Sequence, residues 1–401
     1  MAKWEKVKLG EIATITSSKR IFAKEYQTEG IPFYRGKEII EKHNGNNVST
    51  ELYITRERYE EIKSKFDVPK PGDILLSSVG TLGVSWLVDE EEFYFKDGNL
   101  TWLRCNEKTI SKFLYLWLNS PEAQNQIDLM CIGSTQKALT IEVLNKFDVS
   151  LPPLNIQKKI CEVVYPLTDK IKTNTVINRN LSEQAQAIYE SWFVSFEKFG
   201  GVVPLDWEDG VLGDIAEIKT TSFKPDKEPD VIVEHYSIPA LDEKHFPVFE
   251  LAEGIKSNKY LLNKNSVMIS KLNPDTKRIW RPLCLSDKPV CSTEFIVFEA
   301  KNKKNKDFIF SILDSDKFSN HLCSHVTGST GSRQRAVPKA TLDFKVLIPP
   351  QELIEQFCSI VTPIYDSIGV NEIENQRLSE LRDSLLPKLM SGELDVSDLD
   401  I

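Results

Sequence analysis

The chain has 401 residues, of which 41% are hydrophobic, and this is enough to build the cores of two or three domains. Its formal net charge of −9 argues against indiscriminate binding to polyanions, but it leaves room for a local basic surface, because salt screens charges beyond about 10 Å. Seven cysteines without any C-x-x-C pair fit neither a disulfide scaffold nor a zinc ribbon and indicate a reducing, cytoplasmic location.

Residues 1–150 form the first predicted lobe. The charged start MAKWEKVKLG is not a signal peptide, and no apolar run approaches the roughly 20 residues that a membrane span needs, so no membrane partner is expected. Alternating or short apolar runs bounded by turn residues predict strands at 74–77, 84–88, 93–95 and 100–103. A helix is expected at 113–118.

Residues 151–199 carry a long helical pattern. Its mostly apolar positions alternate four and three apart, which is the seam of a coiled coil rather than the broad face of a globular helix. About 40 helical residues at roughly 1.5 Å each span about 60 Å, so the helix is long enough to hold two lobes apart. The seam consists of Ile160, Val164, Leu167, Ile171, Asn174, Asn178, Leu181, Ala185, Ile188 and Trp192.

Residues 200–348 form a second lobe that repeats the first. The opening W-E-x-x-x-L-G-[ED]-I-A-x-I starts at Trp4 and again at Trp207, an offset of 207 − 4 = 203 residues. Strands are predicted at 267–270 and 290–298, and a helix at 307–313. The two lobes have similar sequences at their ends and different sequences between them. We therefore expect one scaffold that recognises two different ligands.

Residues 349–390 form a second long helix, followed by an acidic tail at 391–401 that is expected to fray. Helices of similar length favour intramolecular antiparallel pairing, although each helix packing only on its own lobe is the alternative. Pairing Asn174 with Asn375 gives 174 + 375 = 549, and the same sum pairs Asn178 with Asn371. Misregistered amides would lose partners, so this asparagine layer is predicted to set the register. Pro166 and Pro363 predict a kink or break in each helix.

Each lobe closes with a Gly-Ser-Thr loop before its last strand and a Pro-Pro pair. Hydroxyls and backbone amides suit phosphates, whereas Gln and Arg pair bidentately with adenine and guanine edges. The alternative for either loop is a solvated hairpin tip without a ligand. The loops provide these candidate DNA contacts: Ser134, Thr135, Gln136 and Lys137 in the first lobe, and Ser329, Thr330, Arg333, Gln334 and Arg335 in the second.

Six further residues are weaker candidates for the same interface. For each of them a solvated surface role fits the sequence at least as well. They are Arg35, Lys37, Ser78, Lys271, Lys277 and Arg278.

Signatures of catalysis and of metal binding are mostly missing. There is no Walker loop, no G-x-S-x-G and no nucleophile–base set, so neither a catalytic residue nor a cofactor is expected. The five histidines share no metal-ligand spacing and are interpreted as surface residues, so no metal site is expected. Pro274-Asp275 with Glu299-x-Lys301 formally fits a magnesium nuclease pattern, but the pattern is loose and the first lobe has no counterpart.

The chain resembles the specificity subunits of type I restriction–modification enzymes. The resemblance rests on the two lobe openings, on the passage GSTQKALTIEVLNKFDVSLPPLNIQKKI and on the ending LSELRDSLLPKLMSGELDVSDL, and it spans the whole chain. It implies two target-recognition domains held apart by antiparallel helices, each domain reading one half of a bipartite double-stranded DNA site. It also implies that the helices dock two methyltransferase subunits and that a restriction subunit completes the nuclease.

Together these features predict an α+β fold of two pseudo-repeated mixed α/β target-recognition domains, separated by two long antiparallel helices that form a coiled coil. The predicted function is that of a non-catalytic DNA-recognition subunit. A coiled-coil adaptor whose lobes bind proteins is the alternative from another class, and a nuclease is a third. Binding to DNA that weakens steeply with salt separates the first from the adaptor.

Overall fold

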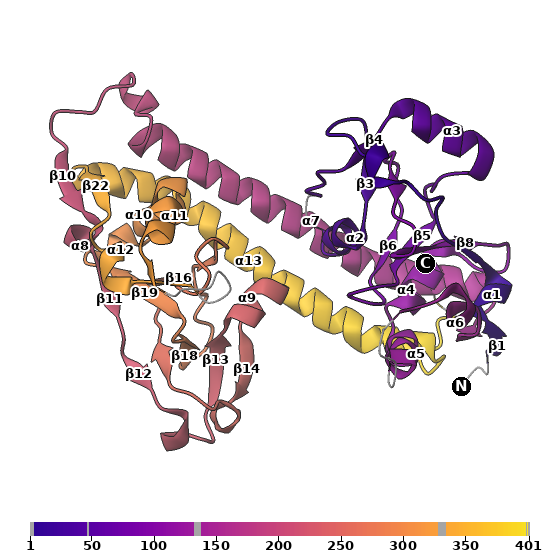
Figure 1. Cartoon of the computed structure of the whole chain (residues 1–401). Coiled ribbons are helices and arrows are strands. Elements are labelled where there is room, and N and C mark those ends of the chain that lie inside the picture. Colours follow the sequence, from indigo (N-terminus) through magenta and orange to yellow (C-terminus); the bar gives the residue numbers. More distant parts are fainter. Residues whose placement is uncertain (1–3, 46–47, 132–137, 328–333, 398, 400–401) are drawn as a thin grey trace. The chain divides into compact units, whose positions relative to one another are not determined.

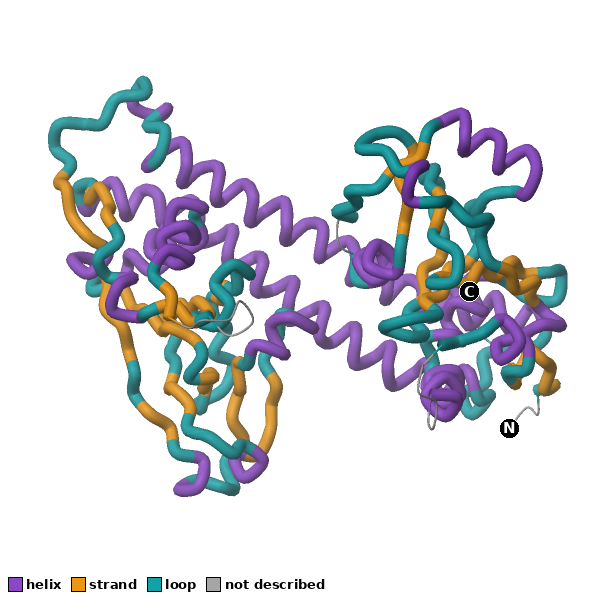
Figure 2. The backbone as a smooth tube through the Cα atoms, viewed as in Figure 1, coloured by secondary structure: helices purple, strands orange, loops and turns teal. Residues whose placement is uncertain are grey.

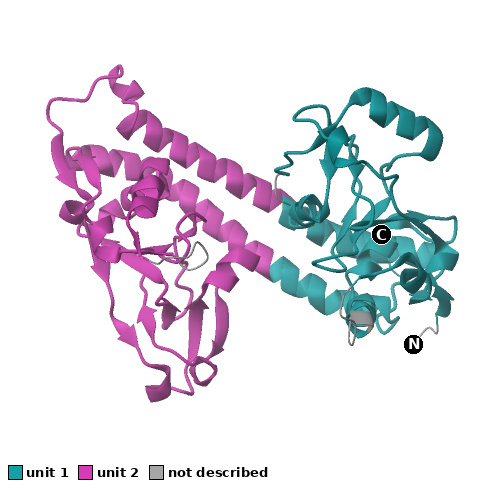
Figure 3. Ribbon diagram, in the orientation of Figure 1, with its two compact units in different colours: residues 1–172, 377–401 teal, residues 173–376 magenta. Residues whose placement is uncertain are grey.

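The computed structural model describes residues 4–45, 48–131, 138–327, 334–397 and 399. It divides into two compact units, unit 1 with residues 1–172 and 377–401 and unit 2 with residues 173–376 (Figure 3). Helices and strands are mixed within each unit, which confirms the predicted fold class (Figures 1 and 2). None of the helices within the described ranges is both long and apolar enough to cross a membrane.

Unit 1 is built around an antiparallel sheet of strand order β2-β8-β5-β6, beside a smaller sheet of order β4-β3-β7 whose β3–β7 pair is parallel. The sequence expectations for strands 74–77, 84–88, 93–95 and 100–103 and for helix 113–118 are confirmed. The elements that precede the first long helix are β1 (Glu5–Lys8), α1 (Leu9–Ile12), β2 (Ala13–Thr16), η1 (Ala23–Glu25), β3 (Ile31–Tyr34), α2 (Gly36–His43), β4 (Tyr53–Ile54), α3 (Arg56–Phe66), β5 (Ile74–Ser77), β6 (Ser85–Leu87), β7 (Tyr94–Phe95), β8 (Leu100–Cys105), α4 (Ser111–Leu118), α5 (Pro121–Cys131), α6 (Ile141–Asn145) and β9 (Asp148–Leu151).

The central strand β5 of unit 1 is buried on both faces, which explains its uninterrupted apolar sequence. Ile74 and Leu76 face one core together with Trp117 of α4. Leu75 points to the opposite face, into a second core that contains Trp102. Helix α4 therefore packs on one face of this sheet, and helix α2 and the smaller sheet pack on the other.

Unit 2 repeats the arrangement with a main sheet of order β11-β19-β16-β17 and a second sheet of order β12-β15-β18-β13-β14. The predicted strand at 290–298 is two strands separated by a turn, and the strand expected at 267–270 and the helix expected at 307–313 are confirmed. Its elements between the long helices are η2 (Glu197–Phe199), β10 (Glu208–Val211), α8 (Leu212–Ile215), β11 (Ala216–Lys219), β12 (Ser222–Phe223), η3 (Pro225–Lys227), β13 (Ile232–Tyr236), α9 (Ile238–Lys244), β14 (Val248–Leu251), η4 (Ala252–Gly254), β15 (Lys259–Leu261), β16 (Ser266–Ser270), β17 (Ile279–Trp280), β18 (Pro289–Ser292), β19 (Phe295–Ala300), η5 (Lys303–Asn305), α10 (Lys306–Asp314), α11 (Asp316–Ser324), β20 (Val326–Thr327), β21 (Arg335–Ala336), α12 (Pro338–Thr341) and β22 (Lys345–Ile348).

The internal repeat seen in the sequence is also a structural repeat. The order β1-α1-β2 recurs as β10-α8-β11 with an offset of 208 − 5 = 203 residues. In each unit the opening strand pairs antiparallel with the closing one, β1 with β9 and β10 with β22. The two ends of each lobe are therefore joined by strand pairing at the point where the chain enters a long helix.

The long helices are α7 (Leu154–Phe193) and α13 (Gln351–Met390), each of 40 residues. Both continue through their prolines, so the break suggested by Pro166 and Pro363 does not occur. An interior proline costs a helix about 3 kcal/mol, and burial of the flanking side chains offsets this cost. Val164 and Val361, each two residues before a proline, are fully buried.

The predicted antiparallel register is confirmed in unit 2. The Asn174 side chain donates to the Asn375 amide oxygen at 2.9 Å, and Asn371 donates to the Asn178 amide oxygen at 2.7 Å. Further along the same register, the Trp192 and Phe357 rings lie 5.8 Å apart, and 192 + 357 again equals 549. The asparagine layer thus lies where the seam places it.

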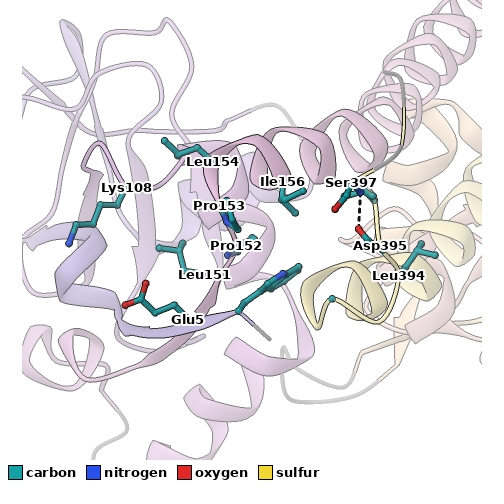
Figure 4. A pocket seen from close by; sticks show the side chains of 13 residues that line it. Glu5, Lys108, Leu151, Pro152, Pro153, Leu154, Ile156, Leu394, Asp395 and Ser397 are labelled. Atoms are coloured by element: carbon teal, nitrogen blue, oxygen red, sulfur yellow. Dashed lines mark hydrogen bonds between the residues drawn. The ribbon is translucent and has the colours of Figure 1, made fainter. Parts of the chain in front are cut away.

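The acidic tail does not fray over residues 391–397, contrary to the expectation from its composition. Val396 is buried in the core of unit 1, and Lys159 at the start of α7 donates to the Ser397 carbonyl. The tail and the strand β9 border a groove of about 600 Å³ that Trp4, Pro153 and Leu394 help to line (Figure 4). The few apolar residues of the tail hold it against unit 1, and a prediction based on charge alone overlooks them.

We predict that Asn371→Ala lowers the free energy of unfolding of unit 2 by about 1 kcal/mol, because the Asn178 amide oxygen loses the donor at its seam position. Denaturant unfolding of the full chain measures this change. Val370→Ala, at a neighbouring position that is 64% exposed, is the matched control and should change stability by less than about 0.5 kcal/mol. Equal destabilisation by both changes would show that the asparagine layer contributes nothing specific.

Candidate nucleic-acid interface

Most of the two Gly-Ser-Thr loops lies outside the described residues. This holds for Ser134, Thr135, Gln136 and Lys137 in the first lobe and for Ser329, Thr330 and Arg333 in the second. The structure describes the residues that flank each loop, and in the second lobe these include Gln334 and Arg335.

In unit 1 the residues that follow the first loop lie beside the end of the central strand β5. Ser78, directly after β5, donates its backbone N–H to the Asn99 carbonyl at 2.8 Å and accepts from the Leu139 N–H at 3.0 Å. Val79 forms an isolated antiparallel bridge with Ala138. The residue after β5, the turn before β8 and the two residues that follow the loop thus form one hydrogen-bonded frame.

Unit 2 has the same frame after its central strand β16. Lys271 donates its backbone N–H to the Glu294 carbonyl at 2.9 Å and accepts from the Ala336 N–H at 2.8 Å. Leu272 forms an isolated antiparallel bridge with Arg335. The backbone pattern equates Lys271 with Ser78, Glu294 with Asn99, and Arg335 with Ala138. We call these two sets of three residues the loop frames.

The loop frame of unit 2 carries charged side chains where that of unit 1 carries small or neutral ones. Arg335 donates through Nε and Nη2 to the two carboxylate oxygens of Glu294, at 3.0 and 3.3 Å. This hydrogen bonding raises the pKa of Arg335. The Arg335 side chain is nevertheless 45% exposed, so the guanidinium also faces solvent. The neighbouring Gln334 accepts from the Asn273 N–H at 2.9 Å through its backbone carbonyl.

Two other candidate cations of unit 2 are bound to acids on neighbouring elements. Arg278, between β16 and β17, forms a bidentate pair with Asp242 at 2.6 and 2.8 Å, and this pairing raises the pKa of Arg278. Lys277 lies 2.6 Å from Asp314, a carboxyl whose pKa is raised by burial. Both side chains thus tie the loop at 271–278 to helices α9 and α10.

The three weaker candidates of unit 1 are placed differently from one another. Arg35 caps α2, where its backbone N–H and its guanidinium bind the fully buried Glu38 at 2.8 and 2.7 Å. Lys37 is largely exposed and lies 3.7 Å from Glu41. The side chain of Ser78 is buried and hydrogen-bonded to Thr101, so its backbone rather than its hydroxyl belongs to the loop frame.

Within the described ranges, no group of three or more His, Cys, Asp or Glu side chains is arranged to hold a metal ion. The Glu299 carboxylate of the nuclease-like pattern accepts from Asn263 at 2.5 Å, and Asp275 accepts from the Thr276 N–H at 3.0 Å. The surface interpretation is wrong for His235, which contacts Glu250 at 2.7 Å inside unit 2 and whose pKa is lowered by burial. Strand β13 alternates its faces and turns this histidine inward.

Sequence reasoning missed Glu294 and Asn99. Neither belongs to a motif, and Glu294 lies 335 − 294 = 41 residues from the arginine that it binds. The strand pairing contains the signal, because Ser77 lies opposite Leu100 and Ser270 lies opposite Phe295. Aligning the two central strands with their partners equates the residues just before Leu100 and Phe295.

Residues 1–183 and 204–382 match the sequence model of the family described as type I restriction modification DNA specificity domain. The chain is 25% identical over 425 residues to the type I restriction enzyme MjaIX specificity subunit of Methanocaldococcus jannaschii, covering 99% of this chain and 94% of that one. It is 22% identical to the type I restriction enzyme HindI specificity subunit of Haemophilus influenzae, covering 98% and 100%.

A similar fold occurs in the crystal structure of the S subunit of a type I restriction–modification system from M. genitalium. The TM-score is 0.59 at 17% sequence identity, and the alignment covers 96% of each chain. The arrangement of two repeated lobes with two long helices is thus a shared architecture.

Proposed function

This chain belongs to the family of type I restriction modification DNA specificity domains, and from that premise we propose that it is the sequence-specific DNA-recognition subunit of a type I restriction–modification complex. The observation that carries the proposal is the repetition of one loop frame with unlike side chains in two lobes that both match the family. A protein that reads two different half-sites needs this combination, because constant backbone geometry positions side chains and variable side chains specify bases.

Each lobe reads one half of a bipartite site in double-stranded DNA. Beside the buried Ser78, the loop frame of the first lobe has Asn99 and Ala138 at the positions where that of the second lobe has Glu294 and Arg335. Unlike hydrogen-bonding groups at equivalent positions select unlike bases, because each base pair shows its own pattern of donors and acceptors in the major groove.

The interface of the second lobe centres on Lys271, Gln334 and Arg335. Lys277 and Arg278 border this surface, but each is bound to a carboxylate, Asp314 and Asp242, and adds little net charge to it. The remaining loop residues extend the two interfaces, together with Arg35 and Lys37 in the first lobe: Ser134, Thr135, Gln136 and Lys137, and Ser329, Thr330 and Arg333.

The helices α7 and α13 space the two lobes and dock two methyltransferase subunits, and a restriction subunit completes the complex. Large apolar side chains that are exposed on both helices support a docking role, since such side chains gain free energy when a partner covers them. They are Val176, Ile177, Val370 and Leu381. The chain itself contributes recognition and no catalytic step, so DNA cleavage by the isolated chain with Mg²⁺ would contradict this assignment.

Exchanging residues 207–347 for the corresponding segment of another specificity subunit should change one half of the methylated motif and leave the other half as it is. The reason is that the exchanged segment contains one complete loop frame. Sequencing of methylated bases in cells that carry the chimera measures the outcome. A chimera that changes both halves together would contradict separate reading by the two lobes.

Two single substitutions distinguish contacts of the second lobe with DNA phosphates from contacts with DNA bases. Lys271→Ala should weaken binding to all DNA sequences alike and reduce the slope of log K against log salt by about 1. Arg335→Ala should relax the preference at one base pair by about 1–3 kcal/mol. Titration of labelled duplexes with the assembled complex at several salt concentrations measures both effects.

Arg278→Ala is the matched control for these substitutions, because Arg278 is held by two hydrogen bonds to Asp242. Its effect on affinity should be smaller than that of Lys271→Ala, and the base preference should not change. If Lys271→Ala and Arg335→Ala both leave binding as it is in the wild type, the loop frame is not part of the interface.

A further inference from the structure

The contact between Glu294 and Arg335 leaves one edge of the guanidinium available. A guanidinium has five N–H donors in a fixed planar fork. Glu294 occupies one donor on Nε and one on Nη2. Of the three donors that remain, one on Nη1 and the second one on Nη2 point away from the carboxylate in parallel, and they form an end-on pair suited to two adjacent acceptors.

Both partners of this contact are held by their backbones. Glu294 lies in the turn between β18 and β19, where its N–H bonds to the Ser292 hydroxyl at 3.2 Å and its carbonyl accepts from Lys271 at 2.9 Å. Arg335 pairs with Thr327 across the β20–β21 ladder and with Leu272 on the other side. A side chain anchored in this way presents its donors with little freedom to reorient.

We infer that Glu294 is a positioning residue for DNA recognition, which holds the inner edge of Arg335 so that its outer edge meets the O6 and N7 acceptors of a guanine. This inference rests on the proposed function and names the base chemistry of one contact in the second half-site. Arginine paired bidentately with guanine O6 and N7 is the commonest specific contact in the major groove.

Charge favours a base over a phosphate as the ligand of this arginine. A contact with phosphate draws mainly on net positive charge, and the adjacent carboxylate cancels the charge of Arg335. The carboxylate leaves the directional donors of the outer edge intact, and these are what a guanine edge requires. For an arginine that contacts only DNA phosphates, the neighbouring Glu294 carboxylate would weaken the electrostatic attraction.

Substitution of Glu294 or Arg335 should affect only the half-site that the second lobe reads, because the loop frame of unit 1 has different residues at these positions. Ala138 occupies the position of Arg335 there, and Asn99 the position of Glu294, so this pair of charges has no counterpart in the first loop frame. The half-site read by the first lobe therefore serves as an internal reference in every measurement on these variants.

The test uses the full chain assembled with its methyltransferase subunits and a library of duplexes randomised in both half-sites. The variants are Glu294→Ala, Glu294→Gln, Arg335→Ala and the double change of both residues to Ala. We expect Glu294→Ala to reduce the preference for guanine at one base pair by about 5- to 150-fold, with the first half-site unchanged. Glu294→Gln should cause a smaller loss, because its amide oxygen still accepts one of the two hydrogen bonds.

Two further readouts separate positioning from a general effect on the fold. The double variant should discriminate no worse than Arg335→Ala alone, because Glu294 acts through Arg335. Binding of Glu294→Ala to random DNA at low salt should be no weaker than that of the wild type, because the change removes a negative charge. Glu217→Ala, which removes the same charge from an exposed pair with Lys219 in unit 2, is the matched control and should leave base preference unchanged.

Wild-type discrimination at every base pair in Glu294→Ala would overturn the inference, and so would a loss spread evenly over the whole second half-site. A wild-type complex that shows no bipartite preference at all would instead refute the proposed function. The two failures are therefore distinguishable in one experiment.

Discussion

Two pairs of asparagine amides, Asn174 with Asn375 and Asn178 with Asn371, set the register of α7 against α13 in unit 2. A slip by one heptad would place these amides against aliphatic side chains and leave donors unpaired at about 1–3 kcal/mol each. The same helices supply Tyr189 and Phe357 to the core that holds the main sheet of unit 2. The register of the helices therefore determines where that sheet, and the loop frame at the end of its central strand, are placed.

The loop frame separates the tasks of positioning and reading. Backbone hydrogen bonds from the residue after the central strand are nearly the same in the two lobes, 2.8 and 3.0 Å at Ser78 and 2.9 and 2.8 Å at Lys271. None of these bonds depends on the side chain, so the exposed positions can change without loss of the scaffold. This freedom explains how two lobes keep their ends alike while their interiors diverge.

The helices, their register and most strands could be predicted from periodicity and from the internal repeat, because each is encoded by local spacing. The loop frames could not be predicted from the sequence, because residues such as Glu294 and Arg335 come into contact only after the sheet has formed. Local rules also misled where tertiary packing outweighed them. Burial around Val164 and Val361 keeps the helices continuous near their prolines, and Val396 anchors an acidic tail.

The central claim is that this chain decides which DNA sequence is modified. Its most direct test is a genome-wide profile of methylated bases in otherwise identical cells that carry or lack the chain. A bipartite motif that is methylated only when the chain is present is the predicted result. An identical set of methylated motifs in both kinds of cell would contradict the claim.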